Sequence, residues 1–444
     1  MKLKRILGVM AVAGLTVPGM AWATNGYFSH GYGMKAKGMG GAATAVTGDT
    51  FGGANNPASM VWAGDRLDVG VDLFSPDRSV SRQGSTGFGG LYNGSSNSGN
   101  DLFFVPELGY NKMLGWNMAV GVTVYGNGGM NTEYKPGLNG GAAAAAFAPS
   151  CAGAPSNMLF GCGKLGVDLM QLIIAPTFSM KINKEHSFGI SPLIGYQRFK
   201  VDGLQAFAEL GFSSNPANTT NRGYDSAHGF GVRLGWIGKI SDSVTLGAAY
   251  SSKIRMSKFG KYKGLFAEGG DFDIPENYNF GIAFKATPAL TVSADIQQIN
   301  YGDVKSIANG VTPSLLNPVA NPLGASTGSG FKWRDQTVFK LGVEYAYNNN
   351  LTLRAGYNYG KSPIRNGTID DVTFNILAPG VVEKHLTLGV TWTLANKDEL
   401  TVSYMHAFSK SITGPSATVL LGVGGTETLK MHQNALGIAY GMKF

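Results

Sequence analysis

Charge, cysteine and long apolar runs are all scarce in this chain of 444 residues. Charged residues make up 14%, about half of the usual quarter, and the basic ones are scattered, which excludes a nucleic-acid-binding stripe. A disordered chain is excluded as well, because 43% of the residues are apolar and can be buried. No run of 18 apolar residues follows Thr24, so the chain is not a helical membrane protein.

Glycine, by contrast, is abundant, with 65 residues, about twice its usual share. Because glycine weakens a helix interior by about 1 kcal/mol relative to alanine, this content argues against a helix-rich soluble protein. The formal net charge of +8 includes three basic residues near the start, in a segment that we expect to be removed.

The first 23 residues have the three parts of a signal peptide. Residues 2–5 carry positive charge, residues 6–17 are apolar, and residues 21–23 read Ala-Trp-Ala, a small-x-small cleavage site. A membrane anchor is the alternative, but this apolar stretch is shorter than the ~20 residues that span a bilayer. We therefore expect residues 1–23 to be a signal peptide, the mature chain to start at Thr24, and the protein to be exported.

Apolar and polar residues alternate with period two from Arg66 onward, which indicates strands with two different faces. The stretches 351–359 and 386–394 show the pattern clearly. About fourteen segments share it. They begin near Arg66, Phe103, Asn117, Val167, Ser187, Gly229, Ser243, Asp273, Ala289, Arg334, Asn350, Val382, Asp398 and Leu429.

The connections between these segments alternate between short turns and long loops. Residues 241–242 and 348–349 are short turns, whereas every second connection is far longer and rich in Gly, Asn, Ser and Pro. An outer-membrane barrel has this order, with short periplasmic turns and long extracellular loops, and its strands close into a ring because a bilayer cannot hydrate backbone groups. We predict an all-β fold, a transmembrane antiparallel β-barrel of about 14 strands over residues 66–444.

Residues 24–65 precede this pattern and do not alternate. They are rich in Gly and Ala, with a turn-forming Asn-Asn-Pro-Ala sequence at residues 55–58. A ring of this width would otherwise enclose a sizeable channel. We therefore expect these residues to form a small N-terminal plug, or hatch, in the lumen. The alternative is a disordered periplasmic tail.

The stretch from Gly31 to Ser59, with GMGGAATA followed by NNPAS, resembles the start of the outer-membrane long-chain fatty acid transporter family (FadL-type). Relatives in this family import aromatic hydrocarbons and other apolar small molecules. The family's Asn-Pro-Ala hatch motif falls on Asn56, Pro57 and Ala58. The resemblance extends through the whole chain, from the hatch and the predicted strands to the aromatic C-terminal residue, Phe444.

This resemblance implies a monomeric barrel in the outer membrane, in contact with its lipid and lipopolysaccharide, with no cofactor and no nucleic-acid partner. Extracellular loops would catch a hydrophobic small molecule, and an apolar pocket in the lumen would hold it. An opening beside a kinked third strand would release it sideways, by facilitated diffusion. Long-chain fatty acids are the first expected substrate and aromatic or alkane hydrocarbons the alternative. A general diffusion porin is less favoured, because it fits the barrel but not the hatch.

Glycine interrupts the third segment, and glycine in a strand marks a bend or a bulge. Gly121, or the group Gly126, Gly128 and Gly129, is therefore the predicted position of the kink and of the lateral opening. An ordinary strand end that runs into a loop is the alternative.

Family members place basic side chains near a bound carboxylate, to which a charge-assisted hydrogen bond is strong. The resemblance implies this role for Arg198 and Lys332, with Lys200 in reserve; salt bridges or rim charges are the alternative. Apolar loop residues are the expected surface capture groove, against plain loop packing. They are Leu204, Phe207, Leu210, Phe212, Leu265 and Phe266.

Cys151 and Cys162 are the only cysteines, and in an exported protein two cysteines indicate one disulfide. The six histidines show no ligand spacing, so we predict no metal site. An enzyme is also disfavoured. The sequence has no Gly-x-Ser-x-Gly motif, and Ser403 and His406 would point to opposite faces of one strand.

Overall fold

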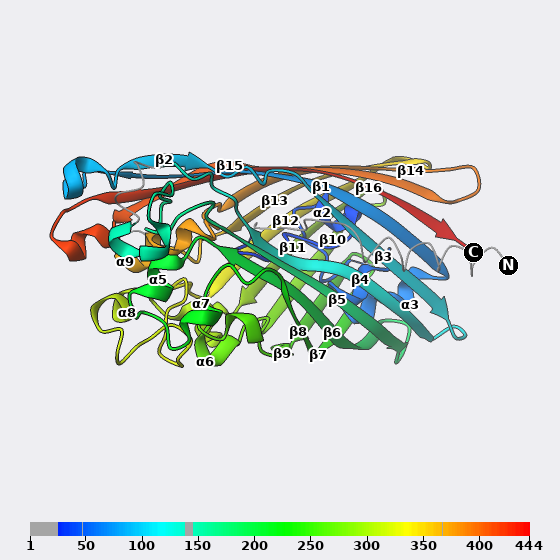
Figure 1. Ribbon diagram of the computed structural model, residues 1–444. Coiled ribbons are helices and arrows are strands. Elements are labelled where there is room, and N and C mark those ends of the chain that lie inside the picture. The colour runs from blue at the N-terminus through cyan, green and yellow to red at the C-terminus, as the bar shows by residue number, and fades with distance from the viewer. Residues whose placement is uncertain (1–24, 47, 138–144, 366) are drawn as a thin grey trace.

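The computed structural model describes residues 25–46, 48–137, 145–365 and 367–444. Within them, fourteen antiparallel strands form a closed ring (Figure 1). The predicted signal peptide, residues 1–23, lies outside the described residues.

Each strand of the ring pairs with its neighbours in the chain, and the ring closes where β1 pairs with β16 along its whole length. The prediction of a closed antiparallel barrel is therefore confirmed. The strands are β1 (Arg66–Gln83), β3 (Phe103–Met113), β4 (Met118–Asn131), β5 (Gly166–Lys181), β6 (His186–Asp202), β7 (Asp225–Lys239), β8 (Val244–Ser251), β10 (Asn277–Thr287), β11 (Leu290–Ile299), β12 (Gln336–Asn348), β13 (Leu351–Gly360), β14 (Lys384–Thr393), β15 (Glu399–Pro415) and β16 (Thr426–Lys443).

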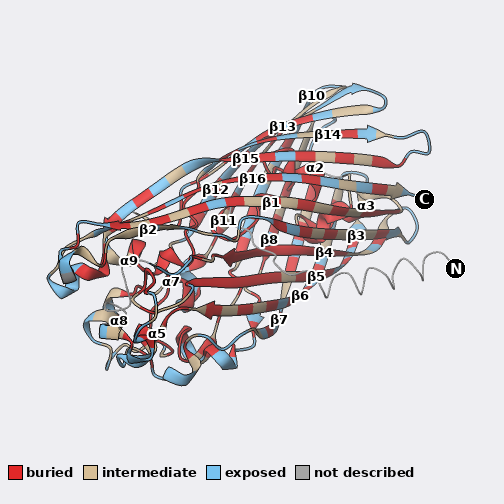
Figure 2. Ribbon diagram, turned by 45° about the horizontal axis from the view of Figure 1, so that its top comes forward, coloured by how far each residue is buried: buried red, intermediate tan, exposed pale blue. Residues whose placement is uncertain are grey.

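The outward face of the ring is apolar, as contact with lipid requires. Along β6, Phe188, Ile190 and Ile194 are exposed, while Ser191 and Gln197 on the opposite face are buried. Alternation of buried and more exposed positions runs along most of the other strands of the wall (Figure 2). Closure of the ring pairs each of its strands with a neighbour on both sides, so most backbone polar groups need no water in the bilayer.

Short turns join the strands at one end of the ring, and long loops join them at the other, which we call the loop end (Figure 1). No helix in the described parts of the chain is long and apolar enough to span a membrane. The long loops carry only short helical segments: η3 (Gly87–Gly90), η4 (Pro149–Cys151), α5 (Gln205–Glu209), η5 (Pro216–Asn218), η6 (Gly260–Tyr262), α6 (Ala267–Gly270), η7 (Tyr301–Asp303), α7 (Lys305–Ala308), α8 (Thr312–Leu316), α9 (Ile369–Val372), η8 (Phe374–Ile376) and η9 (Ala417–Leu421).

Two further strands, which the periodicity of the sequence does not reveal, extend the wall at the loop end. β2 (Gly94–Asn97) pairs with residues 79–82 of β1, and β9 (Arg255–Met256) pairs with β7 at Gly229 and Phe230. They are too short to show an alternating pattern, so only the structure reveals them.

Residues 25–46 and 48–65, which we call the hatch, run inside the ring (Figure 1). They form α2 (Met34–Lys37), η1 (Phe51–Gly53), η2 (Pro57–Ser59) and α3 (Met60–Ala63). The Asn56 side chain caps η2 by accepting a hydrogen bond from the Ala58 N–H at 3.1 Å. The Asn56 amide also donates to the carbonyls of Thr44 at 2.7 Å and Trp236 at 2.9 Å. Because Trp236 is in β7, the Asn-Pro-Ala motif joins the hatch to the wall.

Glycines on the inner face of the wall let the hatch approach the strands backbone to backbone. A Cβ at Gly189 would lie 2.3 Å from the carbonyl carbon of Pro57. A Cβ at Gly356 would lie 2.1 Å from the amide nitrogen of Gly40. Similar close contacts with the hatch occur at Gly109, Gly235, Gly247, Gly281, Gly342, Gly389 and Gly437. The high glycine content therefore serves the packing of the hatch as well as the turns.

Buried charges also join the hatch to the wall. The Lys37 ammonium lies 3.0 Å from Asp72 of β1 and 3.2 Å from Glu107 of β3. The Lys35 ammonium lies 2.6 Å from Glu399 of β15. Removing one partner of such a buried pair costs about 3–5 kcal/mol, because the remaining charge is uncompensated. The position of α2 is therefore tightly fixed.

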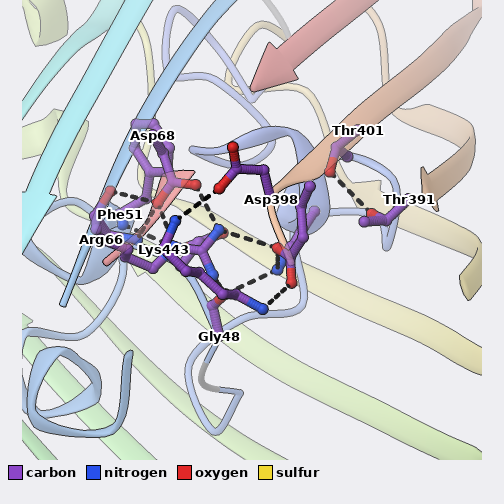
Figure 3. A network of polar contacts seen from close by, with 12 residues as sticks. Gly48, Phe51, Arg66, Asp68, Thr391, Asp398, Thr401 and Lys443 are labelled. Carbon is purple, nitrogen blue, oxygen red and sulfur yellow. Dashed lines mark hydrogen bonds and ion pairs between the residues drawn. The ribbon is translucent and has the colours of Figure 1, made fainter. Parts of the chain in front are cut away.

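One arginine connects the ring closure with the hatch (Figure 3). Arg66 of β1 donates to the two carboxylate oxygens of Asp68 at 2.6 and 2.9 Å, and to the hatch carbonyl of Gly48 at 2.8 Å. Arg66 also lies 3.0 Å from Glu399, which Lys443 of β16 reaches at 2.5 Å. The first and last strands of the ring are thus linked to each other and to the hatch by one set of charges.

Candidate functional site

The regular pairing of β4 is interrupted in its second half. Its register against β5 shifts between Gly126 and Gly128, which makes Asn127 a β-bulge. From there to the end of the strand, both faces are buried, while residues 128–131 stay paired with β5. A bulge bends the strand that contains it, so β4 changes direction at this point. Gly126 and Gly128 flank the bulge and Gly129 is the next residue, whereas Gly121 lies in regular register. Among the glycines predicted to mark a kink, the irregularity therefore lies at the second group.

β3 and β4 stop pairing at the level of this bend. Their last pair is Leu108 opposite Val124, and residues 103–107 of β3 pair with β1 alone. At the loop end the wall continues through a bridge between Ser98 and Tyr134. We call the interruption between these two levels the wall gap.

The start of the hatch lies against the bent part of β4. Phe28 forms a β-bridge with Gly128. A Cβ at Gly128 would lie 1.8 Å from the carbonyl oxygen of Tyr27, so no larger residue fits there. The Tyr32 hydroxyl donates to the Asn127 side-chain oxygen at 3.1 Å. The hatch therefore contacts the bulge directly, and a movement of one would displace the other.

A small cavity of about 10 Å³ lies beside the bent part of β4, and we call it the inner cavity. Two aromatic rings line it, that of Tyr27 from the hatch and that of Trp333, with centroids 5.9 Å apart. The ring of Tyr301 packs against Tyr27 at 5.3 Å. The volume suffices for about one water molecule, so a larger molecule can pass only if the walls move. The lining residues are Tyr27, Arg78, Met130, Asn131, Thr132, Trp333, Ala378, Pro379, Gly380 and Met431.

Arg78 of β1 brings a positive charge to the inner cavity, and only 3% of its surface is exposed. Its guanidinium donates to the carbonyls of Asn131 and Asn100, which lie on the two sides of the wall gap. Within the described residues it forms no ion pair with a carboxylate, and its Nε has no hydrogen-bond partner. A buried cation without an acidic partner is costly, and an anionic ligand would compensate it.

A larger hollow of about 150 Å³ opens among the loops, and we call it the loop groove. Its lining is apolar and comes from four separate loops. Of the residues predicted for a capture groove, Phe207, Leu210 and Phe212 line it, whereas Leu204 lies buried at the start of α5. Leu265 and Phe266 do not line it. The lining residues are Phe147, Phe160, Ala206, Phe207, Leu210, Phe212, Leu315, Ala417, Leu420 and Leu421.

The segment 374–380 lies between the loop groove and the inner cavity. On the groove side, the Phe374 ring meets the Phe207 ring edge to face, with ring centroids 5.0 Å apart. On the cavity side, the Asn375 side-chain oxygen accepts a hydrogen bond from the Trp333 indole at 2.7 Å, and Gly380 lines the cavity. The two hollows are therefore separated by one short segment, whose side chains contact both.

The three basic residues predicted to bind a carboxylate do not gather around one cavity. Arg198 and Lys200 stand on the outward-facing side of β6, because the alternate positions Gln197 and Phe199 point into the ring. They therefore do not line the lumen. Lys332 has a left-handed backbone (φ 57°), is half-buried and precedes Trp333 of the inner cavity. Its own role as a ligand stays a prediction.

Sequence reasoning missed Tyr27, Arg78 and Trp333. The sequence does indicate that the Arg78 side chain points into the ring, because Arg78 lies an even number of residues from the inward-facing Asp72 and Phe74 of β1. Its lack of an acidic partner, however, depends on which strands surround it. Among the described residues, no three His, Cys, Asp or Glu side chains are placed to hold a metal ion.

A disulfide joins Cys151 to Cys162, with Cα atoms 5.5 Å apart. This loop is attached to α5 at the edge of the loop groove, since the Gln205 amide oxygen accepts from the Cys162 N–H at 3.2 Å and its nitrogen donates to the Cys162 carbonyl at 3.1 Å. The disulfide therefore supports one wall of the groove.

Replacing both cysteines by serine should weaken substrate capture about two- to fivefold while the barrel stays folded. The bond closes only a short loop, worth roughly 2–3 kcal/mol, so its loss loosens the groove and not the ring. Equilibrium binding of a fluorescent fatty acid measures the first effect, and heat-modifiable gel mobility the second. Unchanged binding would show that the groove needs no such support.

Together, the plugged ring, the apolar loop groove and the wall gap define a transport barrel, with hollows suited to apolar molecules. The chain belongs to the family of outer membrane protein transport proteins (OMPP1/FadL/TodX), whose family model matches residues 161–444. The comparison with curated protein sequences gave no match.

Solved structures support the same fold. The toluene transporter TodX of Pseudomonas putida matches with 19% identity and a TM-score of 0.66, covering 94% of this chain and 99% of its own. A FadL homologue of Pseudomonas aeruginosa matches with 16% identity and a TM-score of 0.67, covering 94% and 100%. The toluene transporter TbuX of Ralstonia pickettii matches with 19% identity and a TM-score of 0.61, covering 94% and 99%. The family and these relatives are transporters and not enzymes.

Proposed function

We propose that this outer-membrane protein imports hydrophobic small molecules by passive diffusion, along a path from the loop groove through the inner cavity to the wall gap. The loop groove would capture the molecule, and displacement of the segment 374–380 would admit it to the inner cavity. The molecule would then leave sideways into the membrane between β3 and β4. A single chain closes the ring, which supports a monomer as the transporting unit.

The observation that carries this proposal is the wall gap beside an apolar interior. An apolar molecule gains about 0.8 kcal/mol for each buried CH₂ group, so an apolar path is favourable where a water-filled pore is not. Lateral release through the gap avoids returning the molecule to water. The hatch, which fills the ring with close contacts, disfavours a general diffusion porin.

For the substrate, we propose long-chain fatty acids, because Arg78 offers an unpaired positive charge at the end of the apolar path. A carboxylate bound there would receive charge-assisted hydrogen bonds, and the alkyl chain would extend toward the loop groove. Hydrocarbons are the second candidate. They are favoured by the apolar lining of the groove and by the outward orientation of Arg198 and Lys200.

Deleting Asn127 should lower the uptake of every hydrophobic substrate at least tenfold. Without the bulge, β4 loses its bend and can continue to pair with residues 103–107 of β3, which closes the wall gap. Uptake of radiolabelled oleate and toluene by cells that lack other importers measures the effect.

The matched control is Asn127→Ala, which keeps the bulge residue and removes only its side-chain contacts with Tyr32 and Gln171. This variant should retain most of the uptake. Normal uptake by the folded deletion variant would exclude lateral release through the wall gap.

A further inference from the structure

A row of basic side chains lies on the outer surface of the barrel at the loop end, away from the proposed path of the substrate. Arg198 and Lys200 are on the outward side of β6, and Arg255 is on β9. Lys258 and Lys261 follow in the next loop and are exposed. We call these five residues the basic column.

The register of the strands shows that these side chains face outward from the barrel. Ile194 of β6 pairs with Phe230 of β7, and Phe230 pairs with Arg255 of β9. Paired residues share a face, so Arg255 points outward with its two apolar neighbours. Arg198 lies four residues beyond Ile194 on the same face of β6, nearer the loop end.

A tyrosine holds the upper part of the column in place. The guanidinium of Arg198 lies 3.4 Å from the centroid of the Tyr224 ring, and the Lys200 ammonium lies 5.0 Å from it. The Tyr224 carbonyl accepts a hydrogen bond from the Lys261 ammonium at 2.7 Å. Burial, with the hydrogen bond to Asp168, raises the pKa of the Tyr224 hydroxyl, which therefore stays protonated. Such cation–π stacking orders the cations without neutralising them.

Nearby carboxylates do not pair with these cations. Within the described residues, none of the five basic side chains forms an ion pair with a carboxylate. The acids that face them are engaged with other donors. Asp168 accepts from the Tyr224 hydroxyl at 2.5 Å, Asp225 from the Lys261 backbone N–H at 2.8 Å, and Asp273 from the Met256 N–H at 2.7 Å. Asp168 and Asp273 attract the nearby cations electrostatically without contacting them. The column therefore keeps five cations whose charged groups are free of direct carboxylate contacts within the described residues.

The surface beside Arg255, at the lower end of the column, is apolar and strongly exposed. Phe230 is 66% and Tyr196 46% exposed on the same outward face. Such large apolar side chains on a barrel wall face acyl chains, and tyrosine marks the membrane interface. The basic column therefore lies at the height of lipid headgroups.

We propose that the basic column binds the phosphate groups of a phosphorylated outer-leaflet glycolipid of the lipid A type, whose acyl chains rest on the apolar wall below. Arginine suits this ligand because its planar fork gives two parallel hydrogen bonds to phosphate. Charges placed near a membrane surface attract anionic headgroups. The site concerns anchoring in the outer leaflet and does not depend on the substrate path.

The test uses the full-length protein purified in detergent and titrated with bisphosphorylated lipid A, dephosphorylated lipid A and phosphatidylglycerol. The variant replaces Arg198, Lys200 and Arg255 by glutamine. We expect it to bind bisphosphorylated lipid A at least tenfold more weakly than the unmodified protein, which itself should prefer the phosphorylated form by a similar factor. Native mass spectrometry of the complexes gives both affinities.

The matched control removes three positive charges from the turn end, with Lys184, Lys285 and Lys397 replaced by glutamine, and should bind lipid A within twofold of the unmodified protein. If loss of Arg198 disturbs folding, a second variant with Arg255, Lys258 and Lys261 changed to glutamine tests the same column. Unchanged binding by folded column variants would overturn the proposal. Equal affinity of the unmodified protein for phosphatidylglycerol would overturn its preference for a glycolipid.

Discussion

Replacing Arg78 by methionine should lower the affinity for oleate and its uptake about tenfold or more, while toluene uptake stays within about twofold. A hydrogen bond to a charged group contributes about 1.5–3 kcal/mol, and each 1.4 kcal/mol is a factor of ten. Toluene has no group that Arg78 could bind, so it serves as an internal control. Fluorescent fatty-acid binding in detergent and radiolabelled uptake by cells measure the two effects.

The matched variant is Arg78→Lys, which keeps the positive charge and should retain a substantial part of oleate binding. Because Arg78 also bonds to Asn131 and Asn100, thermal unfolding of each variant must be recorded. Equal loss of oleate and toluene uptake would indicate a structural role for Arg78. Normal oleate binding by the folded methionine variant would move hydrocarbons to first place as substrate.

Replacing Gly356 by valine should displace the hatch and turn the closed barrel into a leaky one. A Cβ at this position would lie 2.1 Å from the backbone nitrogen of Gly40, and neither backbone can give way without moving α2 and the turn after it. Overpacking of a well-packed contact lowers the stability of the fold by about 1–3 kcal/mol. We expect the upper part of this range here, because the added atoms clash with backbone, which cannot move aside as a side chain can. We expect ion conductance in planar bilayers to rise severalfold, and the hatch to become accessible to protease.

The control is Gly260→Val, because a Cβ at Gly260 has no neighbour within 4 Å and its backbone is not left-handed. Heat-modifiable gel mobility checks that both barrels are folded. A folded Gly356→Val variant that stays as tight as the control would show that the inner glycines are not needed to seat the hatch. Both outcomes are independent of the substrate, so this test separates the packing of the hatch from the chemistry of transport.

Much of the fold could be predicted from the sequence because strand periodicity is local. The predicted starts at Arg66 and Phe103 coincide with those of β1 and β3, and the one at Ser187 lies within a residue of β6. Alternation and turn chemistry act between neighbouring residues, so a single sequence reveals them. β2 and β9 were not predictable, because segments of this length carry no period and form only beside a longer strand.

The candidate site was less predictable, because it depends on contacts between distant segments. Arg198 and Ile194 are four residues apart on β6, so both side chains lie on the same, outward face. This alternation disagrees with the role near a bound carboxylate that the family resemblance implies for Arg198. The role proposed for Arg78 depends on residues far away in the chain, including Trp333 and Gly380. No local pattern shows that a charged side chain has no partner.

The sequence by itself determined that the chain forms strands with one apolar face and that short turns alternate with long loops. Those features depend on residue order alone, since period two and turn residues are local properties. Only the tertiary structure decided that β4 is bulged at Asn127 and parts from β3 there, that the hatch contacts the inner glycines, and that Arg78 has no carboxylate partner among the described residues. These features arise when distant strands close into a ring, because closure decides which side chains meet and which remain unpaired.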